Sequence, residues 1–115
     1  MIGYKKVIGR DPITHRNTKP YIIELYIVKN TFIYVGDCNK CRAEQAFFTK
    51  VYDFSSGKLI PKEKAKRLKL RSEHDGNFTY IINKIIRPTT PYSMDHRTCD
   101  SGIHFFLTKT EAMSW

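Results

Sequence analysis

The chain has 115 residues, of which 41% are hydrophobic and 13% aromatic, which is typical of one globular domain and excludes a disordered segment. Its 20 Lys and Arg against 11 Asp and Glu give a formal net charge of +9, which favours anionic partners. No apolar run approaches the roughly 20 residues of a membrane-spanning helix, and the N-terminal residues lack the apolar core of a signal peptide. We therefore expect a single domain over residues 1–115, not secreted and without a membrane span.

Strand patterns dominate the chain. Six segments carry the β-branched, aromatic or alternating pattern of strands: residues 3–9, 21–28, 31–35, 48–54, 78–86 and 103–107. Polar or glycine-containing turn signals lie at 29–30, 55–58 and 73–77. The polar pair at 29–30 predicts a hairpin between the second and third strands. The first half of residues 41–54 is ambiguous and also suits a helical turn.

Two segments favour short helices. Helix formers follow Pro61 within residues 58–71, where an extended arm is the alternative. Thr108 and Glu111 have the spacing of a capping box, which predicts a C-terminal helix with Trp115 as its packing anchor. The sequence thus predicts an α+β fold, a small β-rich domain with a mainly antiparallel sheet of about 5–6 strands and one or two short helices.

Positive charge is concentrated in residues 58–71, which we expect to form a basic exposed segment within the domain. Its basic side chains are candidates for binding nucleic acid or an acidic partner: Lys58, Lys62, Lys64, Lys66, Arg67, Lys69 and Arg71. The alternative is a solvated loop that only improves solubility.

The cysteines raise the possibility of a metal site. An odd number of cysteines without a secretion signal fits free thiols or a metal better than disulfides. Cys38 and Cys41 have the spacing of a zinc knuckle, and Cys99 with His104, or with His96, would supply the remaining tetrahedral ligands. The irregular second pair also suits reduced cysteines, two of them buried. We expect no cofactor, with zinc as the alternative.

Cys99 could also act as a thiol nucleophile with His104 or His96 as its base. The sequence supplies no obvious oxyanion hole or orienting acid, although two aspartates are near. Strand alternation places His104 on the same face as Phe106, which is a common setting for a structural histidine. We therefore expect no enzymatic activity and no catalytic residue.

Aromatic and basic residues interleave at Tyr4-Lys5-Lys6 and at Lys50-Val51-Tyr52. Sheet aromatics beside a basic arm suit single-stranded nucleic acid, through stacking and phosphate contacts. The alternative is that these rings simply form the core of a small β-rich domain.

Three motifs in this chain resemble a known pattern. They are Gly3–Lys6, Lys40–Ala43 and, after Asp95–Arg97, the segment Cys99–Phe106 (Cys-x-x-Gly-Ile-His-Phe-Phe) followed by Thr108 and Glu111-Ala112. The pattern resembles a small uncharacterised domain of large double-stranded DNA viruses, which also occurs joined to pentapeptide-repeat proteins. The resemblance marks these as family-signature residues: Cys41, Arg42, Cys99, Gly102, His104 and Phe105. Cys38 lies outside the pattern, which weakens the zinc knuckle.

The resemblance implies a viral origin and no particular reaction. By analogy, a compact, basic and aromatic domain suits a minor component of a virion. We therefore expect a non-enzymatic viral structural or interaction protein, a minor capsid or other virion component, in the virion or the infected-cell cytoplasm. Its partners would be other viral proteins, with nucleic acid as a further candidate partner. The alternatives are a basic nucleic-acid-binding accessory protein and, behind it, a zinc- or thiol-dependent site.

Overall fold

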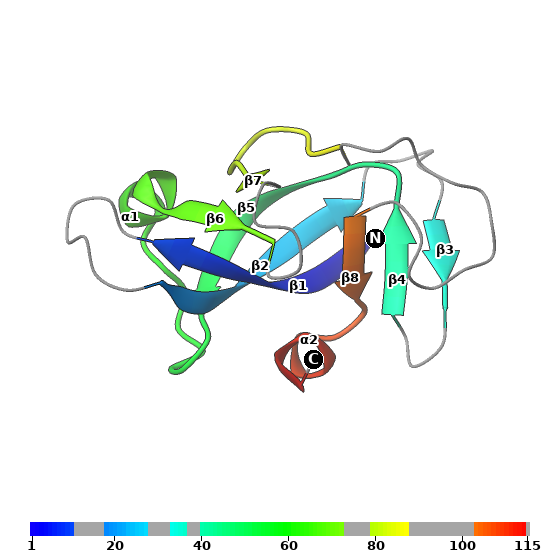
Figure 1. Cartoon of the computed structure of the whole chain (residues 1–115), viewed down its shortest axis with the longest axis horizontal. Coiled ribbons are helices and arrows are strands. Elements are labelled where there is room, and N and C mark those ends of the chain that lie inside the picture. The colour runs from blue at the N-terminus through cyan, green and yellow to red at the C-terminus, as the bar shows by residue number, and fades with distance from the viewer. Residues whose placement is uncertain (11–17, 28–32, 37–39, 73–78, 88–102, 115) are drawn as a thin grey trace.

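The computed structural model describes residues 1–10, 18–27, 33–36, 40–72, 79–87 and 103–114 (Figure 1). These residues form eight strands and two short helices: β1 Ile2–Arg10, β2 Lys19–Ile27, β3 Ile33–Val35, β4 Lys40–Ala43, β5 Ala46–Asp53, α1 Lys62–Arg67, β6 Lys69–Arg71, β7 Thr79–Tyr80, β8 Ile103–Phe106 and α2 Lys109–Ser114. All pairings between these strands are antiparallel. The expected small β-rich α+β domain with a C-terminal helix is confirmed, and short strands such as β6 and β7 bring the strand number to eight.

β1 is the central strand of the sheet, whose order is β3-β4-β8-β1-β2-β5 with β6 and β7 branching from β1. One edge of β1 pairs with β2 along nearly its whole length. The other edge is shared, because β8 pairs at Tyr4 and β6 pairs at residues 8–10. Figure 1 shows the result as two wings, with β6 and α1 at one end of the long axis and β4 and β3 at the other.

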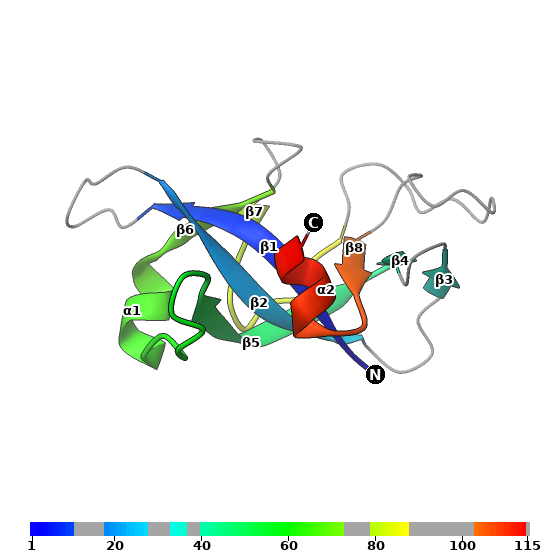
Figure 2. The ribbon, with the colours of Figure 1, turned by 90° about the horizontal axis from the view of Figure 1, so that it is seen from below.

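The sheet curls around the main core, and we call the core side its inner face. Buried side chains from every strand except β3 fill it, Val7, Leu25 and Phe48 among them, and α1 adds Ala65. The other side, the outer face, carries a smaller cluster of Ile22, Phe106 and Ala112. Because Ala112 belongs to α2, this helix covers part of the outer face, as Figure 2 shows from below.

The segment after β7 returns to β5 and does not continue as a strand. Residues 78–86 were expected to form one strand, but only Thr79–Tyr80 does so within the described residues. Asn83 has φ 64°, a left-handed conformation that asparagine tolerates and that ends extended structure. The Asn83 N–H donates to the Phe48 carbonyl at 2.9 Å, and Ile86 then bridges to Ala46. The segment therefore packs along β5 as a turn.

The hairpin expected between the second and third strands is wrong. β3 pairs with β4 at the far edge of the sheet, because β1 and β5 already occupy both edges of β2. The turn at 29–30 itself lies outside the described residues. The ambiguous residues after position 40 form strand β4, whose Cys41 and Ala43 are fully buried. Burial against β8, a contact distant in sequence, decides between strand and helical turn here.

The expected strand over 48–54 is confirmed as β5, with one irregularity. Its register with β2 shifts between Glu24 and Leu25, so that Thr49 is an extra residue between Phe48 and Lys50. Such a bulge bends the strand locally. Lys50 and Tyr52 consequently lie opposite Glu24 and Ile22 on the outer face.

The C-terminal helix begins as the capping box predicts. The Glu111 N–H donates to Thr108 Oγ1 at 3.2 Å, and the Thr108 hydroxyl donates to Glu111 Oε1 at 2.7 Å. Trp115, its expected anchor, lies outside the described residues. Each of the two helices in the described part of the chain has six residues, and no helix there is long and apolar enough to span a membrane.

Candidate basic interaction site

Residues 58–71 are tied to the core, although they hold seven of the chain's 20 Lys and Arg residues. The Ile60 N–H donates to the Val51 carbonyl at 2.8 Å, and α1 follows directly after Pro61. Ile60, Ala65, Leu68 and Leu70 are buried in the main core. Of the two interpretations, helix and extended arm, the structure therefore shows a short helix followed by strand β6.

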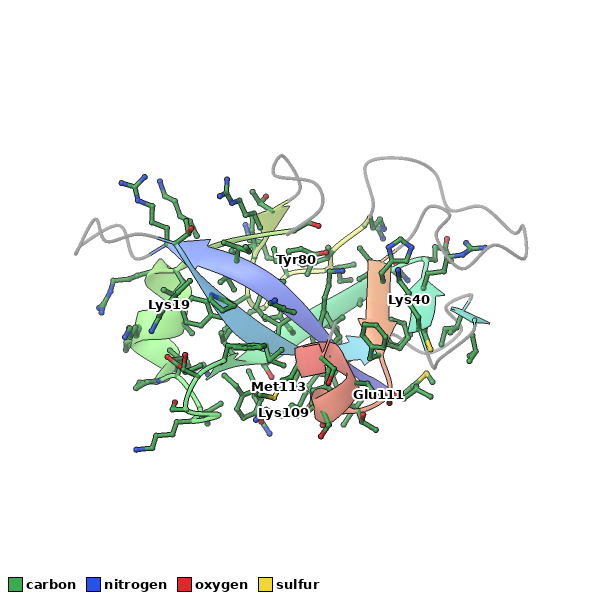
Figure 3. All side chains as sticks on the ribbon, turned by 60° about the horizontal axis from the view of Figure 1, so that its bottom comes forward. Lys19, Lys40, Tyr80, Lys109, Glu111 and Met113 are labelled. Atoms are coloured by element: carbon green, nitrogen blue, oxygen red, sulfur yellow. The ribbon has the colours of Figure 1, made fainter. Side chains whose placement is uncertain are left out.

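The same packing directs the charged side chains outward. Since the apolar residues take the inward positions, the basic residues between them are left to solvent. Six of the seven candidates are exposed and Lys64 is half-buried: Lys58, Lys62, Lys64, Lys66, Arg67, Lys69 and Arg71. Figure 3 shows nitrogen-tipped side chains extending from α1 and from the adjoining end of the sheet.

Strand pairing brings one further cation to this end of the molecule. Arg10, the last residue of β1, lies directly opposite Lys69 of β6, and Arg71 lies opposite Ile8. Leu70, between the two cations of β6, points into the main core, so Arg10, Lys69 and Arg71 share the outer face. Like charges directly opposite each other on paired strands are destabilising. We call Arg10 together with the seven basic residues of 58–71 the basic end.

Among the described residues, a single ion pair involves a member of the basic end. Lys66 pairs with Glu63 at 3.8 Å on the exposed surface of α1, and such pairs are weak. Across the described ranges, no ion pair involves Arg10, Lys69 or Arg71. The basic end therefore presents a field that attracts anions.

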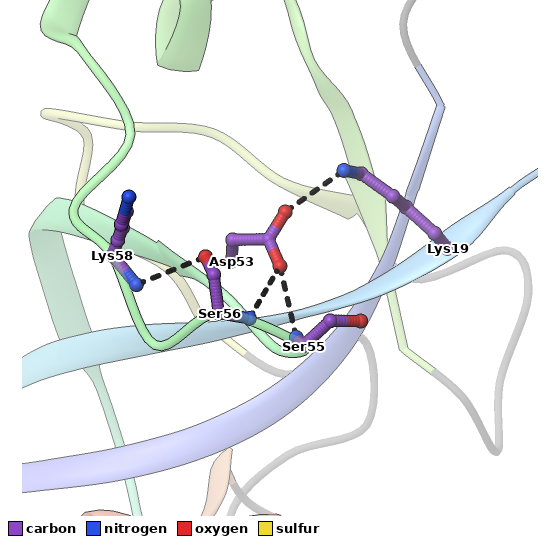
Figure 4. Close-up of polar contacts among 5 residues, drawn as sticks. All are labelled: Lys19, Asp53, Ser55, Ser56 and Lys58. Carbon is purple, nitrogen blue, oxygen red and sulfur yellow. Dashed lines mark hydrogen bonds and ion pairs between the residues drawn. The ribbon is translucent and has the colours of Figure 1, made fainter.

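Two acids on β5 and β2, Asp53 and Glu24, have other partners within the described part of the chain. Asp53, at the end of β5, accepts from Lys19 Nζ at 2.8 Å and from the backbone N–H groups of Ser55 and Ser56 at 2.8 and 3.1 Å (Figure 4). The hydrogen bond from Lys19, reinforced by the Ser56 N–H, holds the pKa of the Asp53 carboxyl below its ordinary value. This carboxylate therefore fixes the turn after β5, where Gly57 has φ +71°.

Glu24 is the second such acid, and it is nearly buried on the outer face. Its carboxylate accepts from the Tyr52 hydroxyl at 3.4 Å and lies 3.7 Å from Lys50 Nζ. Burial and, next, the charge of Glu24 raise the pKa values of Tyr52 and Tyr4 above the ordinary value for tyrosine. Both hydroxyls are thus protonated donors at neutral pH.

Cations and aromatic rings are paired on the outer face between the basic end and α2. Lys6 Nζ lies 5.1 Å from the centroid of the Phe54 ring. Lys109 Nζ of α2 lies 3.8 Å from the centroid of the Tyr52 ring and donates to the Gly57 carbonyl at 3.3 Å. These distances fit cation–π contacts. The surface next to the basic end therefore offers ammonium groups and partly exposed rings together.

Sequence analysis missed three contributors to this surface: Arg10, Phe54 and Lys109. They come from β1, from the turn after β5 and from α2. Strand register places Arg10 opposite Lys69, and packing places Phe54 beside Lys6 and Lys109 beside Tyr52. The sequence signal for this surface was the alternation of aromatic and basic residues around Lys6 and around Tyr52.

The three motifs behind the family resemblance meet on the neighbouring strands β1, β8 and β4. Phe105 packs directly over Gly3, where a Cβ atom would overlap its ring. Phe105 also lies opposite Cys41, and His104 lies opposite Arg42. The signature residues Cys99 and Gly102 lie outside the described residues. The described part of the signature is therefore a packing unit between strands.

The metal and thiol candidates are brought together only in part. Cys38, Cys99 and His96 lie outside the described residues. Cys41 and His104 are on adjacent strands but on opposite faces, since Cys41 pairs with Phe105 and His104 with Arg42. Burial and, to a lesser degree, the charge of Glu111 raise the pKa of the Cys41 thiol. Among the residues that the structure describes, no group of three potential metal-ligating side chains is present.

Arg42 has the largest fully buried side chain among the described residues, with 1% of its surface exposed. It lies on the outer face of β4, between Cys41 and Ala43, which both point into the main core. Both faces of β4 are thus covered. Arg42 serves the packing of this wing and adds no charge to the basic end.

The fold and surface define a small β-rich α+β domain with a cationic outer end. A family of unknown function, DUF5758, matches residues 1–112, and the chain belongs to this family. No curated protein and no solved structure matches the chain.

Proposed function

We propose that this protein is a non-enzymatic structural or interaction protein of a large double-stranded DNA virus, and a minor capsid or other virion component. It acts in the virion or in the infected-cell cytoplasm, where other viral proteins and nucleic acid are the available partners. The family resemblance of its three motifs supports the viral origin, and the basic end supports the interaction role.

One observation carries the proposal. The basic end combines eight cations with a rigid support, because Ile60, Ala65, Leu68 and Leu70 fix its backbone to the core. A preorganised charged surface loses little conformational entropy on binding. Opposed cations such as Arg10 and Lys69 repel each other, and an anionic partner relieves that repulsion. The surface is therefore suited to an acidic partner.

The test is incorporation into particles. Deleting 58–71 would remove core residues and unfold the domain, so charge reversal of exposed residues is the sharper perturbation. We expect the variant Lys62→Glu/Arg67→Glu to be lost from purified particles. The matched control, Lys84→Glu/Arg87→Glu, changes the same residue types on the exposed segment after β7 and should be retained. Absence of the unaltered protein from particles, or equal incorporation of both variants, would contradict the proposal.

A second function, that of a nucleic-acid-binding accessory protein, is favoured by the lysines held over Phe54 and Tyr52. An acidic protein would satisfy the cations alone, whereas nucleic acid also supplies flat rings. This function predicts affinity for DNA or RNA that falls steeply with salt. Salt-independent affinity would contradict it.

A further inference from the structure

We propose that the outer face between the basic end and α2 binds single-stranded nucleic acid. Arg10, Lys69 and Arg71 contact phosphates, and the rings of Phe54 and Tyr52 receive bases. This inference rests on the proposed function, since it names the partner that the basic end binds.

The cations on this face follow the direction of β1. Arg10 and Lys69 form the first row, Ile8 and Arg71 the second, and Lys6 begins the third, where it lies opposite Ile22 and in turn Tyr52. Successive rows on one face of a sheet are about 6.8 Å apart, twice the rise of one residue. At least one cation therefore recurs in each row along a path of three rows.

The third row is where the rings begin. Lys6 lies over Phe54, and Lys109 of α2 lies over Tyr52. Phe54 and Tyr52 are both half-buried, with their packed sides against the cluster under α2. The rings are thus held from one side, and each has an ammonium group over it, which moves onto the nucleotide's phosphate when a base stacks on the ring. A nucleotide, which joins one phosphate to one flat base, matches both groups at once.

The pairing of charge with rings favours a single strand over a duplex or an acidic protein. In a duplex each base face is covered by its neighbours, so stacking on protein rings needs unpaired bases. An acidic peptide would contact the same cations without using the rings. Replacing the cations should therefore weaken binding of any of the three partners, whereas replacing a ring should weaken binding only of a single strand. The two kinds of variant together distinguish a single strand, a duplex and an acidic protein.

The experiment measures anisotropy of a labelled oligothymidylate of about 15 nucleotides, a length within the site size of small single-strand binders. The variant Arg10→Gln/Lys69→Gln should weaken binding about tenfold and make the log–log salt slope shallower by about 1.4, or roughly 0.7 for each lost phosphate contact. Lys84→Gln/Arg87→Gln removes the same charge elsewhere. This variant should keep the phosphate contacts, and so the salt slope, and should keep the difference in affinity between single strand and duplex.

Phe54→Leu keeps an apolar side chain and removes the ring. We expect about tenfold weaker binding with an unchanged salt slope, since stacking releases no counterions. Wild-type affinity for Phe54→Leu would overturn the inference in favour of a purely ionic surface. Three other results would also overturn the inference. They are equal effects of the two charge variants, tighter binding of a duplex of the same length, and no binding at about 50 mM salt. Arg10 and Lys69 are exposed, so the comparison of the two charge variants tests the inference even if Phe54→Leu lowers stability.

The outcome is separable from that of the proposed function. A protein that enters particles but does not bind the oligonucleotide refutes this inference alone. A protein that binds the oligonucleotide as expected but is absent from particles refutes the virion role alone.

Discussion

Replacing Gly3 with alanine should destabilise the domain strongly, because Phe105 packs on the backbone there. An alanine Cβ would overlap Phe105 Cδ2 and lie 2.8 Å from Cε2. The ring is 1% exposed, and close-packed protein interiors leave an enclosed ring little room to move. Overpacking of this kind costs about 1–3 kcal/mol, and overlap with an enclosed ring places Gly3→Ala at the upper end. At about 4 °C per kcal/mol, the melting temperature should fall by roughly 12 °C.

The assay is urea unfolding followed by circular dichroism, with two companion variants. Gly57→Ala has no neighbour within 4 Å of the new Cβ and suffers only from φ +71°, which costs about 1 kcal/mol. Phe105→Leu should relieve the overlap, so Gly3→Ala/Phe105→Leu should be more stable than the sum of the single effects by at least about 1 kcal/mol. Additive effects, or an unfolding midpoint for Gly3→Ala equal to the wild-type value, would refute the direct packing of Phe105 on Gly3.

Three further predictions concern single groups. Because the folded-state pKa of Asp53 is lowered, its contribution to stability is full above the unfolded pKa of about 4 and is lost as pH falls through the folded value. The difference in unfolding free energy between wild type and Asp53→Asn, measured with urea, should therefore shrink as the pH is lowered below the unfolded pKa, and a difference independent of pH would contradict this. In a Cys38→Ser/Cys99→Ser background, buried Cys41 with its raised pKa should react with a thiol reagent only in urea; rapid labelling of the native protein would refute its burial. Arg42→Ala should lower the free energy of unfolding by about 3 kcal/mol through a cavity, whereas Arg42→Met, which retains the stem volume, should lower it less. Equal melting temperatures of the two variants would show that the side chain is not enclosed.

Local patterns predicted much of the fold. The patterns at 3–9, 48–54 and 103–107 predicted strands, and the alternation at 103–107 gave the correct faces, since Ile103 and Phe105 enter the main core while Phe106 joins the outer cluster. At 48–54 the predicted faces were wrong, because the bulge at Thr49 puts Phe48 in the main core while Tyr52 stays on the outer face. The capping box at Thr108 also operates as its spacing indicates. These features depend on residues a few positions apart, where side-chain chemistry acts directly on the backbone.

Long-range packing decided the rest. Within residues 78–86 the one local signal for a turn is Asn83 itself, and the turn is fixed by its hydrogen bond to the distant Phe48 carbonyl. The pairing of β3 with β4 likewise depends on which strand edges are already occupied. The seven cations of 58–71 were identifiable from composition. Their combination with Arg10 and Lys109 follows from strand register and from the position of α2, which the sequence does not display.

Photo-crosslinking from the centre of the outer face inside purified particles tests the central claim most directly. A benzophenone amino acid in place of Ile8 lies opposite Arg71 and next to Pro20 across the strands, and it leaves every cation intact. The same group in place of Ile81, which is exposed on the segment after β7, is the control. We expect a nuclease-sensitive adduct from position 8 and none from position 81. No adduct from position 8, or one that only protease removes, would contradict the assignment of this face to nucleic acid in the virion.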